Sequence, residues 1–219
     1  MPSITISREY GSGAIHIAER LCERLGYGYF DKNLMVQVAA EMGVSETDVV
    51  DFSEDTYRMR SFLERLFGRR SIRPEPGVTG ESAPALREKM LTEQEGVRLI
   101  KDTIIGAYER GSFVIVGRAG QAILRDKPAV LHVRLVAPLG ARALRVKDRE
   151  ELSLGEATNL AVTRDQAAAA YLERFFDIDW NNPMLYHLVL NTGRWELDGA
   201  IDIIASALAN LKVISEIWR

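Results

Sequence analysis

The residues best suited to chemistry in this sequence form a short glycine turn between two segments of different periodicity. Gly11-Ser12-Gly13 follows a β-branched run at residues 3–7 and precedes a stretch with helical spacing at residues 14–25. Backbone N–H groups in such a turn can approach an anion closely, and the dipole of the following helix favours negative charge there. The position predicts a phosphate-binding loop, with a purely structural tight turn as the alternative.

This turn departs from the common phosphate-loop pattern G-x-x-x-x-G-K-[ST] at three places. The pattern would put glycine at Arg8, lysine at Ala14 and a hydroxyl at Ile15. Without the lysine, the positive charge on the β- and γ-phosphates must come from elsewhere, and without the hydroxyl one usual magnesium ligand is missing. Arg8 and His16 are the nearby side chains that could partly replace them.

Several arginines further along the chain could supply this charge. Arg142, Arg145 and Arg149 are three and four residues apart, so they can share one helix face. Phosphoryl transfer needs such groups to neutralise negative charge that spreads in the transition state. The alternative is an ordinary solvated helix surface. Arg118 directly follows an apolar run, and a residue at the carboxyl end of a strand faces the usual ligand crevice of an open α/β sheet.

The elements that must position these residues alternate between strand and helix patterns. Short apolar or β-branched runs predict strands at residues 3–7, 27–30, 113–117, 130–135 and 186–190. Helical spacing predicts helices at residues 14–25, 33–42, 86–110, 139–149, 155–176 and 200–211. Residues 67–84 are rich in Arg, Pro, Gly and Ser and predict a mobile loop. This order predicts an α/β fold with a doubly wound, mainly parallel five-stranded sheet.

Composition narrows the class of protein. The chain has 219 residues, 47% of them hydrophobic, and a formal net charge of −3. This length suits one domain, and an acidic balance argues against binding to nucleic acid or to an anionic membrane. The single cysteine, Cys22, excludes an intramolecular disulfide, and no signal peptide or membrane span is evident, so a cytoplasmic location is expected. The three scattered histidines do not have metal-site spacing.

Several blocks of the sequence together resemble the cytidylate-kinase-like family, a divergent branch of the P-loop nucleoside monophosphate kinases. The opening block is Ile4-Thr5-Ile6-Ser7-Arg8-Glu9-Tyr10-Gly11-Ser12-Gly13, and members of this branch already lack the loop lysine. Later blocks are Val114 to Arg118, His132 to Pro138 with Arg142, Arg164-Asp165, Tyr171, Arg174, Asp179-Trp180-Asn181 and Tyr186 to Thr192. Only residues 51–86 are not covered, so the resemblance implies a single P-loop kinase domain over residues 1–219, with a variable acceptor-side segment at about 51–86 and a helical lid at about 145–180.

The resemblance implies transfer of the γ-phosphoryl group of ATP to a nucleoside monophosphate such as CMP, with Mg²⁺. It implies catalytic roles for Arg8, Arg142, Arg145 and Arg174, and phosphate or ATP contacts for Gly11, Ser12, Gly13, Asn191 and Thr192. It implies acceptor contacts for Asp31, Arg118, Arg164 and Asp165 and no protein-held metal. From its position alone, Asp31 could equally be a helix cap.

Two other functions stay open at this point. Ala14 and Ile15 replace residues that usually hold phosphate and magnesium, which favours a non-catalytic regulatory protein that binds a nucleotide or a phosphoanion. A kinase for another small molecule would use the unmatched residues 51–86 for its acceptor. The apolar tail at residues 213–218 is compatible with a homo-oligomer.

Overall fold

The computed structural model describes residues 1–30 and 93–211. The helix expected at 33–42, the loop at 67–84, the segment at 51–86, Asp31 and the tail at 213–218 lie outside the described residues. The described strands are β1 (Ser3–Arg8), β2 (Gly28–Phe30), β3 (Phe113–Val116), β4 (Val130–Val136) and β5 (Leu188–Asn191). The helices are α1 (Ala14–Leu25), α5 (Glu93–Arg110), α6 (Gly120–Ile123), α7 (Leu139–Glu150), α8 (Leu154–Phe176), a 3₁₀ turn η1 (Pro183–Leu185) and α9 (Leu197–Ala209).

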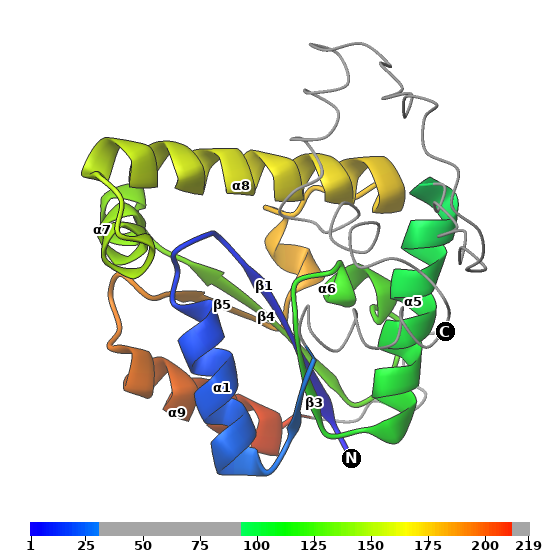
Figure 1. The fold of residues 1–219 in the computed structure, drawn as a ribbon. Helices are drawn as coiled ribbons and strands as arrows, with labels where there is room; N and C mark the ends of the chain where they lie inside the picture. The colour runs from blue at the N-terminus through cyan, green and yellow to red at the C-terminus, as the bar shows by residue number, and fades with distance from the viewer. Residues whose placement is uncertain (31–92, 212–219) are drawn as a thin grey trace, which may run out of the picture.

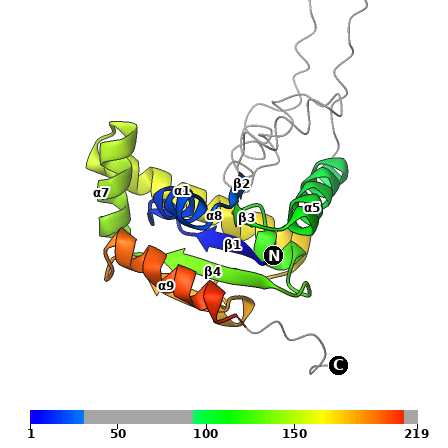
Figure 2. The same ribbon diagram turned by 90° about the horizontal axis from the view of Figure 1, so that it is seen from below.

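The strands form one five-stranded sheet in the order β2-β3-β1-β4-β5, and every pairing is parallel. Helices α1 and α9 cover one face of the sheet, and α5 and α6 cover the other (Figures 1 and 2). The predicted doubly wound α/β fold is therefore confirmed. Because all strands run the same way, their carboxyl ends meet at one edge, where β1 leads into the glycine loop.

The central strand β1 sorts its side chains by the period of two that a strand imposes. Ile4 and Ile6 are buried in the cluster that includes α1 and α9 residues. Ser3, Thr5 and Ser7 alternate with them and are also buried, at 1% exposure or less. The sheet therefore has an apolar face under α1 and α9 and a partly polar one on the side of α6.

The boundaries of two elements differ from the sequence prediction for local reasons. β5 begins at Leu188 rather than at residue 186, because Tyr186 ends the 3₁₀ turn. Its hydroxyl donates to Trp180 O at 2.8 Å and lies 3.2 Å from Ser7 Oγ. α9 begins at Leu197 rather than at residue 200, after Glu196 in an extended conformation. The short helix α6 and the 3₁₀ turn η1 had no periodic signal in the sequence because each is under five residues long.

A buried histidine, His132, lies on the polar face of the sheet next to the exposed His187. His132 on β4 lies 2.7 Å from Thr5 Oγ1 through Nδ1, and its backbone N–H donates to His187 Nδ1 at 3.0 Å. The two rings stack with centroids 5.0 Å apart. Burial, together with the neighbouring His187, lowers the pKa of His132 to about 4. The protein therefore holds this imidazole neutral at pH values where an exposed histidine is protonated.

This burial predicts a loss of stability in mild acid. The unfolded chain takes up a proton on His132 as the pH falls through 6.5, whereas the folded protein does so only near its lowered pKa of about 4. The stabilising difference is thus present above 6.5 and is lost as the pH falls, by about 2 kcal/mol between pH 7 and pH 5. Urea unfolding across this range should show the loss in the wild type and a smaller one in His132→Asn. Equal pH dependence in the two proteins would contradict the assignment.

Candidate functional site

The glycine loop lies at the carboxyl end of β1 and opens directly into α1. Gly11 and Gly13 both have φ of 85°, a left-handed conformation in which a residue with a side chain is strained. Gly13 is the N-cap of α1 and has no side-chain cap. The first N–H groups of this helix therefore face outward without an intrahelical partner, as at the anion-binding ends of other helices.

Three backbone carbonyls of the loop are held from behind by side chains of other elements. Arg142 Nη1 donates to Tyr10 O at 3.0 Å, Arg145 Nη1 to Gly11 O at 3.4 Å, and Thr192 Oγ1 to Ser12 O at 2.7 Å. A trans peptide is planar, so the N–H that follows each carbonyl points the opposite way. Within the described residues, the amides of Gly11 and Gly13 have no hydrogen-bond acceptor, while Ser12 N–H closes a turn to Glu9 O. The amides of Gly11 and Gly13, which we call the amide cradle, are suited to binding an anion.

Both glycines are also required by close packing. A Cβ on Gly11 would lie 2.7 Å from the backbone O of Arg142 and 2.8 Å from Val146 Cγ2, both on α7. A Cβ on Gly13 would lie 2.8 Å from Leu197 Cδ2, at the start of α9. The loop is therefore packed tightly between α7 and the beginning of α9, which fixes the direction of its amides.

Arg142, expected to contact phosphate, is buried behind the loop. Its Nε donates to Ala137 O at 2.8 Å and lies 3.3 Å from Glu9 Oε2, and its Nη1 pairs with Asp165 Oδ2 at 2.7 Å. Its side chain is only 8% exposed. These contacts make Arg142 a support for the loop, and a direct phosphate contact stays a prediction.

Arg145 joins the glycine loop to the end of β5. Its Nη2 donates to Thr192 O at 2.7 Å, and its Nη1 lies 3.2 Å from Thr192 Oγ1. Asn191 Oδ1 accepts the Gly193 N–H at 3.0 Å and shapes the turn that follows. Of the expected ATP contacts, Thr192 is thus attached to the loop itself and Asn191 lies one residue before it.

The other expected site residues are spread more widely. Arg8 is the last residue of β1, and Arg118 follows β3 with φ of 58° and 8% exposure. Arg164 on α8 has its guanidinium 5.8 Å from the centroid of the Tyr10 ring. Arg174 is on the same helix but ten residues further on, about 15 Å along the axis, and its guanidinium lies 5.4 Å from the ring of Phe175. Arg164 therefore lies beside Tyr10 of the glycine loop, whereas Arg174 lies further along α8.

Asp165, expected to contact the acceptor, lies against the loop. Its Oδ1 accepts the Tyr10 N–H at 2.8 Å, and its Oδ2 accepts from Arg142. Burial raises the pKa of Asp165, and nearby Glu9 adds to this, while the hydrogen bonds from Tyr10 and Arg142 act in the opposite direction. The carboxylate is thus held by good partners in a site that disfavours its charge.

Sequence reasoning missed two side chains of this region. Glu9 Oε2 accepts the Ala137 N–H at 2.9 Å and so ties the loop to the end of β4. Arg134 is 3% exposed, donates to Ser7 Oγ at 3.3 Å and Asn181 Oδ1 at 2.9 Å, and lies 4.3 Å from the ring of Trp180. An arginine within the apolar run at residues 130–135 was the signal for it. A single acid inside a glycine turn gave no comparable signal for Glu9.

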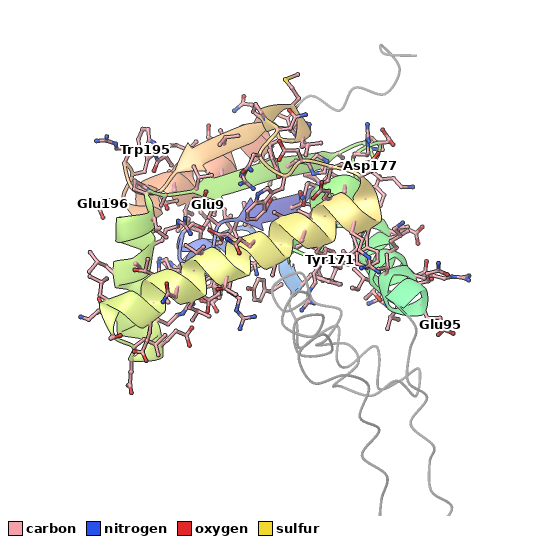
Figure 3. All side chains as sticks on the ribbon, turned by 90° about the horizontal axis from the view of Figure 1, so that it is seen from above. Glu9, Glu95, Tyr171, Asp177, Trp195 and Glu196 are labelled. Atoms are coloured by element: carbon pink, nitrogen blue, oxygen red, sulfur yellow. The ribbon has the colours of Figure 1, made fainter. Side chains whose placement is uncertain are left out.

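Figures 1 and 3 show α8 running across the molecule from α7 to the beginning of α5, with Glu9 beside it. Tyr10 lies between α7 and α8. Its hydroxyl donates to Glu150 Oε1 at 3.1 Å, and the guanidinium of Arg149 lies 5.0 Å from its ring centroid.

Within the described residues, no group of three His, Cys, Asp or Glu side chains is arranged to hold a metal ion, and no helix is both long and apolar enough to cross a membrane.

Comparison with known proteins gives relatives over nearly the whole chain. The profile of the "Cytidylate kinase-like family" matches residues 3–194. The cytidylate kinase of Methanothrix thermoacetophila is 29% identical over 211 residues, which cover 95% of this chain and 99% of that protein. The cytidylate kinase of Thermococcus sibiricus is 29% identical over 209 residues, which cover 95% of this chain and 88% of that protein.

Solved structures agree with the fold. An uncharacterized protein from Eubacterium ventriosum superposes with a TM-score of 0.69 at 20% identity, and the match covers 96% of this chain and 100% of that chain. A gluconokinase from Sinorhizobium meliloti superposes with a TM-score of 0.53 at 13% identity, covering 95% of this chain and 91% of that chain. At these identities the likeness concerns the fold alone.

Proposed function

Since this chain belongs to the cytidylate kinase-like family, we propose that it transfers the γ-phosphoryl group of ATP to a nucleoside monophosphate, with CMP as the first acceptor to test. The family and the kinase fold support a nucleotide kinase type of function. The choice of CMP rests on the cytidylate kinases among the relatives. In this proposal the chain acts as one domain, with residues 145–180 as the lid and residues 51–86 on the acceptor side.

The observation that carries the proposal is the amide cradle. Arg142 and Thr192 hold the carbonyls of Tyr10 and Ser12, so the amides of Gly11 and Gly13 that follow them point the opposite way, while Arg145 holds the carbonyl of Gly11 between them. A set of amides fixed in advance stabilises negative charge without having to reorganise, which is the main protein contribution to phosphoryl transfer. The buried Ser12 Oγ, which has no partner among the described residues, adds a further polar atom at the same turn.

The side chains around the cradle would act in two ways. Arg145 and Thr192 keep the loop in shape, and Arg8 and Arg118, at the ends of β1 and β3, would provide positive charge toward the two substrates. Asp31 would help to hold the acceptor.

The residues present fit the phosphates of ATP better than they fit a free magnesium ion. Ile15, where the common pattern has a hydroxyl, is 46% exposed at the first turn of α1. We therefore propose that Mg²⁺ binds through the phosphates of ATP, as this small cation commonly does. It would supply charge neutralisation on the transferring group.

A second candidate function is nucleotide binding without turnover. It is favoured by Ala14 and Ile15, which are the first residues of α1 and lack both the amine and the hydroxyl of the common pattern. In that case the protein would bind ATP through the same amides and leave the acceptor unphosphorylated. The test below separates the two functions.

The proposal predicts CMP-dependent consumption of ATP. Coupled-enzyme assays with ATP, Mg²⁺ and a panel of CMP, dCMP, UMP, AMP and GMP should show turnover above background, with CMP among the best acceptors. Arg145→Ala removes the bonds to Gly11 O and Thr192 O, so we expect the KM for ATP to rise about tenfold, the value of one charge-assisted hydrogen bond.

Lys147→Ala is the matched control, because this residue is on the same helix and its side chain is 46% exposed. It should leave the KM for ATP unchanged. If every acceptor stays at background while calorimetry shows ATP binding, the kinase proposal is wrong and the second function holds. If ATP does not bind at all, both are wrong.

A further inference from the structure

A carboxylate from the long helix α8 occupies the edge of the glycine loop. Asp165 Oδ1 accepts the Tyr10 N–H at 2.8 Å, although the two residues are 155 positions apart in sequence. Its Oδ2 accepts from Arg142 Nη1 at 2.7 Å, and the same Nη1 donates to Tyr10 O. The Asp165 carboxylate thus accepts hydrogen bonds both from a loop amide and from the arginine that supports the loop.

A backbone N–H and a guanidinium are also the donors that a phosphate oxygen commonly takes. The Tyr10 amide directly precedes the amide of Gly11, the first of the cradle. Asp165 therefore contacts the loop as a phosphate group would, but from within the protein.

Negative charge exceeds positive charge among the side chains at this contact. The side chains of Glu9, Asp165 and Arg142 are 22%, 18% and 8% exposed, so two carboxylates share one guanidinium in a poorly solvated place. Burial and Glu9 both raise the pKa of Asp165, which shows that its ionised form is disfavoured there. A polyphosphate entering the cradle would add further negative charge at short range and would repel the carboxylate.

The surroundings of Tyr10 would remain attractive to an anion once this carboxylate moved. The guanidinium groups of Arg149 and Arg164 lie 5.0 and 5.8 Å from the Tyr10 ring. Arg142 would lose one of its two acidic partners and keep Glu9. Glu9, Asp165 and Arg142 together carry one net negative charge, and without Asp165 the remaining pair is neutral. Arg149 and Arg164, with Glu150 paired to Arg149, add one net positive charge beside Tyr10.

We propose that Asp165 sets the affinity of the loop for polyphosphate: its carboxylate is an internal anion on the Tyr10 amide and Arg142, and a phosphate gains these donors only by replacing it. This inference rests on the proposed function and assigns Asp165 to the phosphate donor's site rather than to the acceptor. The exchange also links occupation of the loop to movement of α8, which carries the carboxylate.

The test compares anion binding rather than turnover. Calorimetry with inorganic pyrophosphate and with ATP should show that Asp165→Asn binds both about tenfold more tightly than the wild type, because one opposing charge is removed at short range. Glu173→Gln is the matched control, since it removes an exposed carboxylate from the same helix; its affinities should equal those of the wild type. If the asparagine variant does not fold, Asp165→Ser carries the same expectation.

The possible outcomes distinguish failure of the role assigned to Asp165 from failure of the proposed kinase function. A purely structural Asp165 would weaken the loop when replaced, so equal or weaker binding by the variant, with normal binding by the wild type, overturns the inference alone. If the wild type and the variants all fail to bind pyrophosphate and ATP, the proposed function fails as well. Thermal unfolding of each variant establishes that the compared proteins are folded.

Discussion

Replacing Gly11 with alanine is expected to destabilise the protein by about 3 kcal/mol and to abolish ATP binding. The left-handed conformation of this residue, with φ of 85°, costs a residue with a Cβ about 1–2 kcal/mol. The new methyl group would also lie 2.7 Å from the backbone O of Arg142, and overpacking of this kind typically adds about 1–3 kcal/mol. Relief would require the loop to move from α7, which would turn the cradle amides away from their present directions.

Gly13→Ala provides the comparison, because it has the same φ but a different neighbour. Its Cβ would meet the end of the Leu197 side chain, which can rotate, rather than backbone. We expect about half the loss of stability and measurable residual ATP binding. Chemical denaturation and calorimetry on both variants check this order. Equal effects of the two substitutions would show that backbone strain alone, and not the close contact of Gly11 with α7, determines the loss of stability.

Removing the guanidinium of Arg142 is expected to have a comparable effect for an electrostatic reason. Arg142→Met keeps most of the side-chain volume but leaves Glu9 and Asp165 as partly buried carboxylates without their shared cation. Breaking a buried ion pair on one side typically costs about 3–5 kcal/mol. The carbonyls of Tyr10 and Ala137 lose their donor as well, so the loop should also bind ATP poorly.

The pH dependence of this loss distinguishes charge from packing. Without the cation the pKa of Asp165, which burial already raises, rises further, so the contribution of this carboxyl to stability is greatest at low pH, where it is protonated, and is lost as the pH increases. Urea unfolding should therefore show a smaller difference from the wild type near pH 4 than at pH 7. Arg142→Lys should fall between the two proteins at pH 7, because it keeps the charge and loses the two-armed geometry. A pH-independent deficit in Arg142→Met would point to packing instead.

The fold could be predicted well from the sequence because its signals are local. The β-branched run before Gly11, the helical spacing after it and the continuous apolar runs at 113–117 and 130–135 all correspond to observed elements. The errors arise where distant contacts decide the boundary. Tyr186 fits a strand by its own pattern, but its hydroxyl lies 3.2 Å from Ser7 Oγ, 179 positions away, and the strand begins only after it.

The position of the glycine loop could be predicted from the sequence, but the hydrogen bonds and ion pairs that hold it could not. Spacing places Arg142 and Arg145 on one helix face, and both do reach the loop. Nothing in that spacing shows that Arg142 is buried between two carboxylates, since one of them, Asp165, comes from the following helix. Short-range patterns identify candidate charges, and only the packing of α7 against α8 decides which of them pair.

The carbonyls fastened by Arg142, Arg145 and Thr192 have a consequence for protein engineering. The shape of the glycine loop is encoded mainly by residues more than a hundred positions away from it. Grafting the six residues from Arg8 to Gly13 onto another strand and helix would transfer the amides without the anchors that orient them. A transplant that is meant to bind phosphate would have to carry the beginning of α7 and the end of β5 with it.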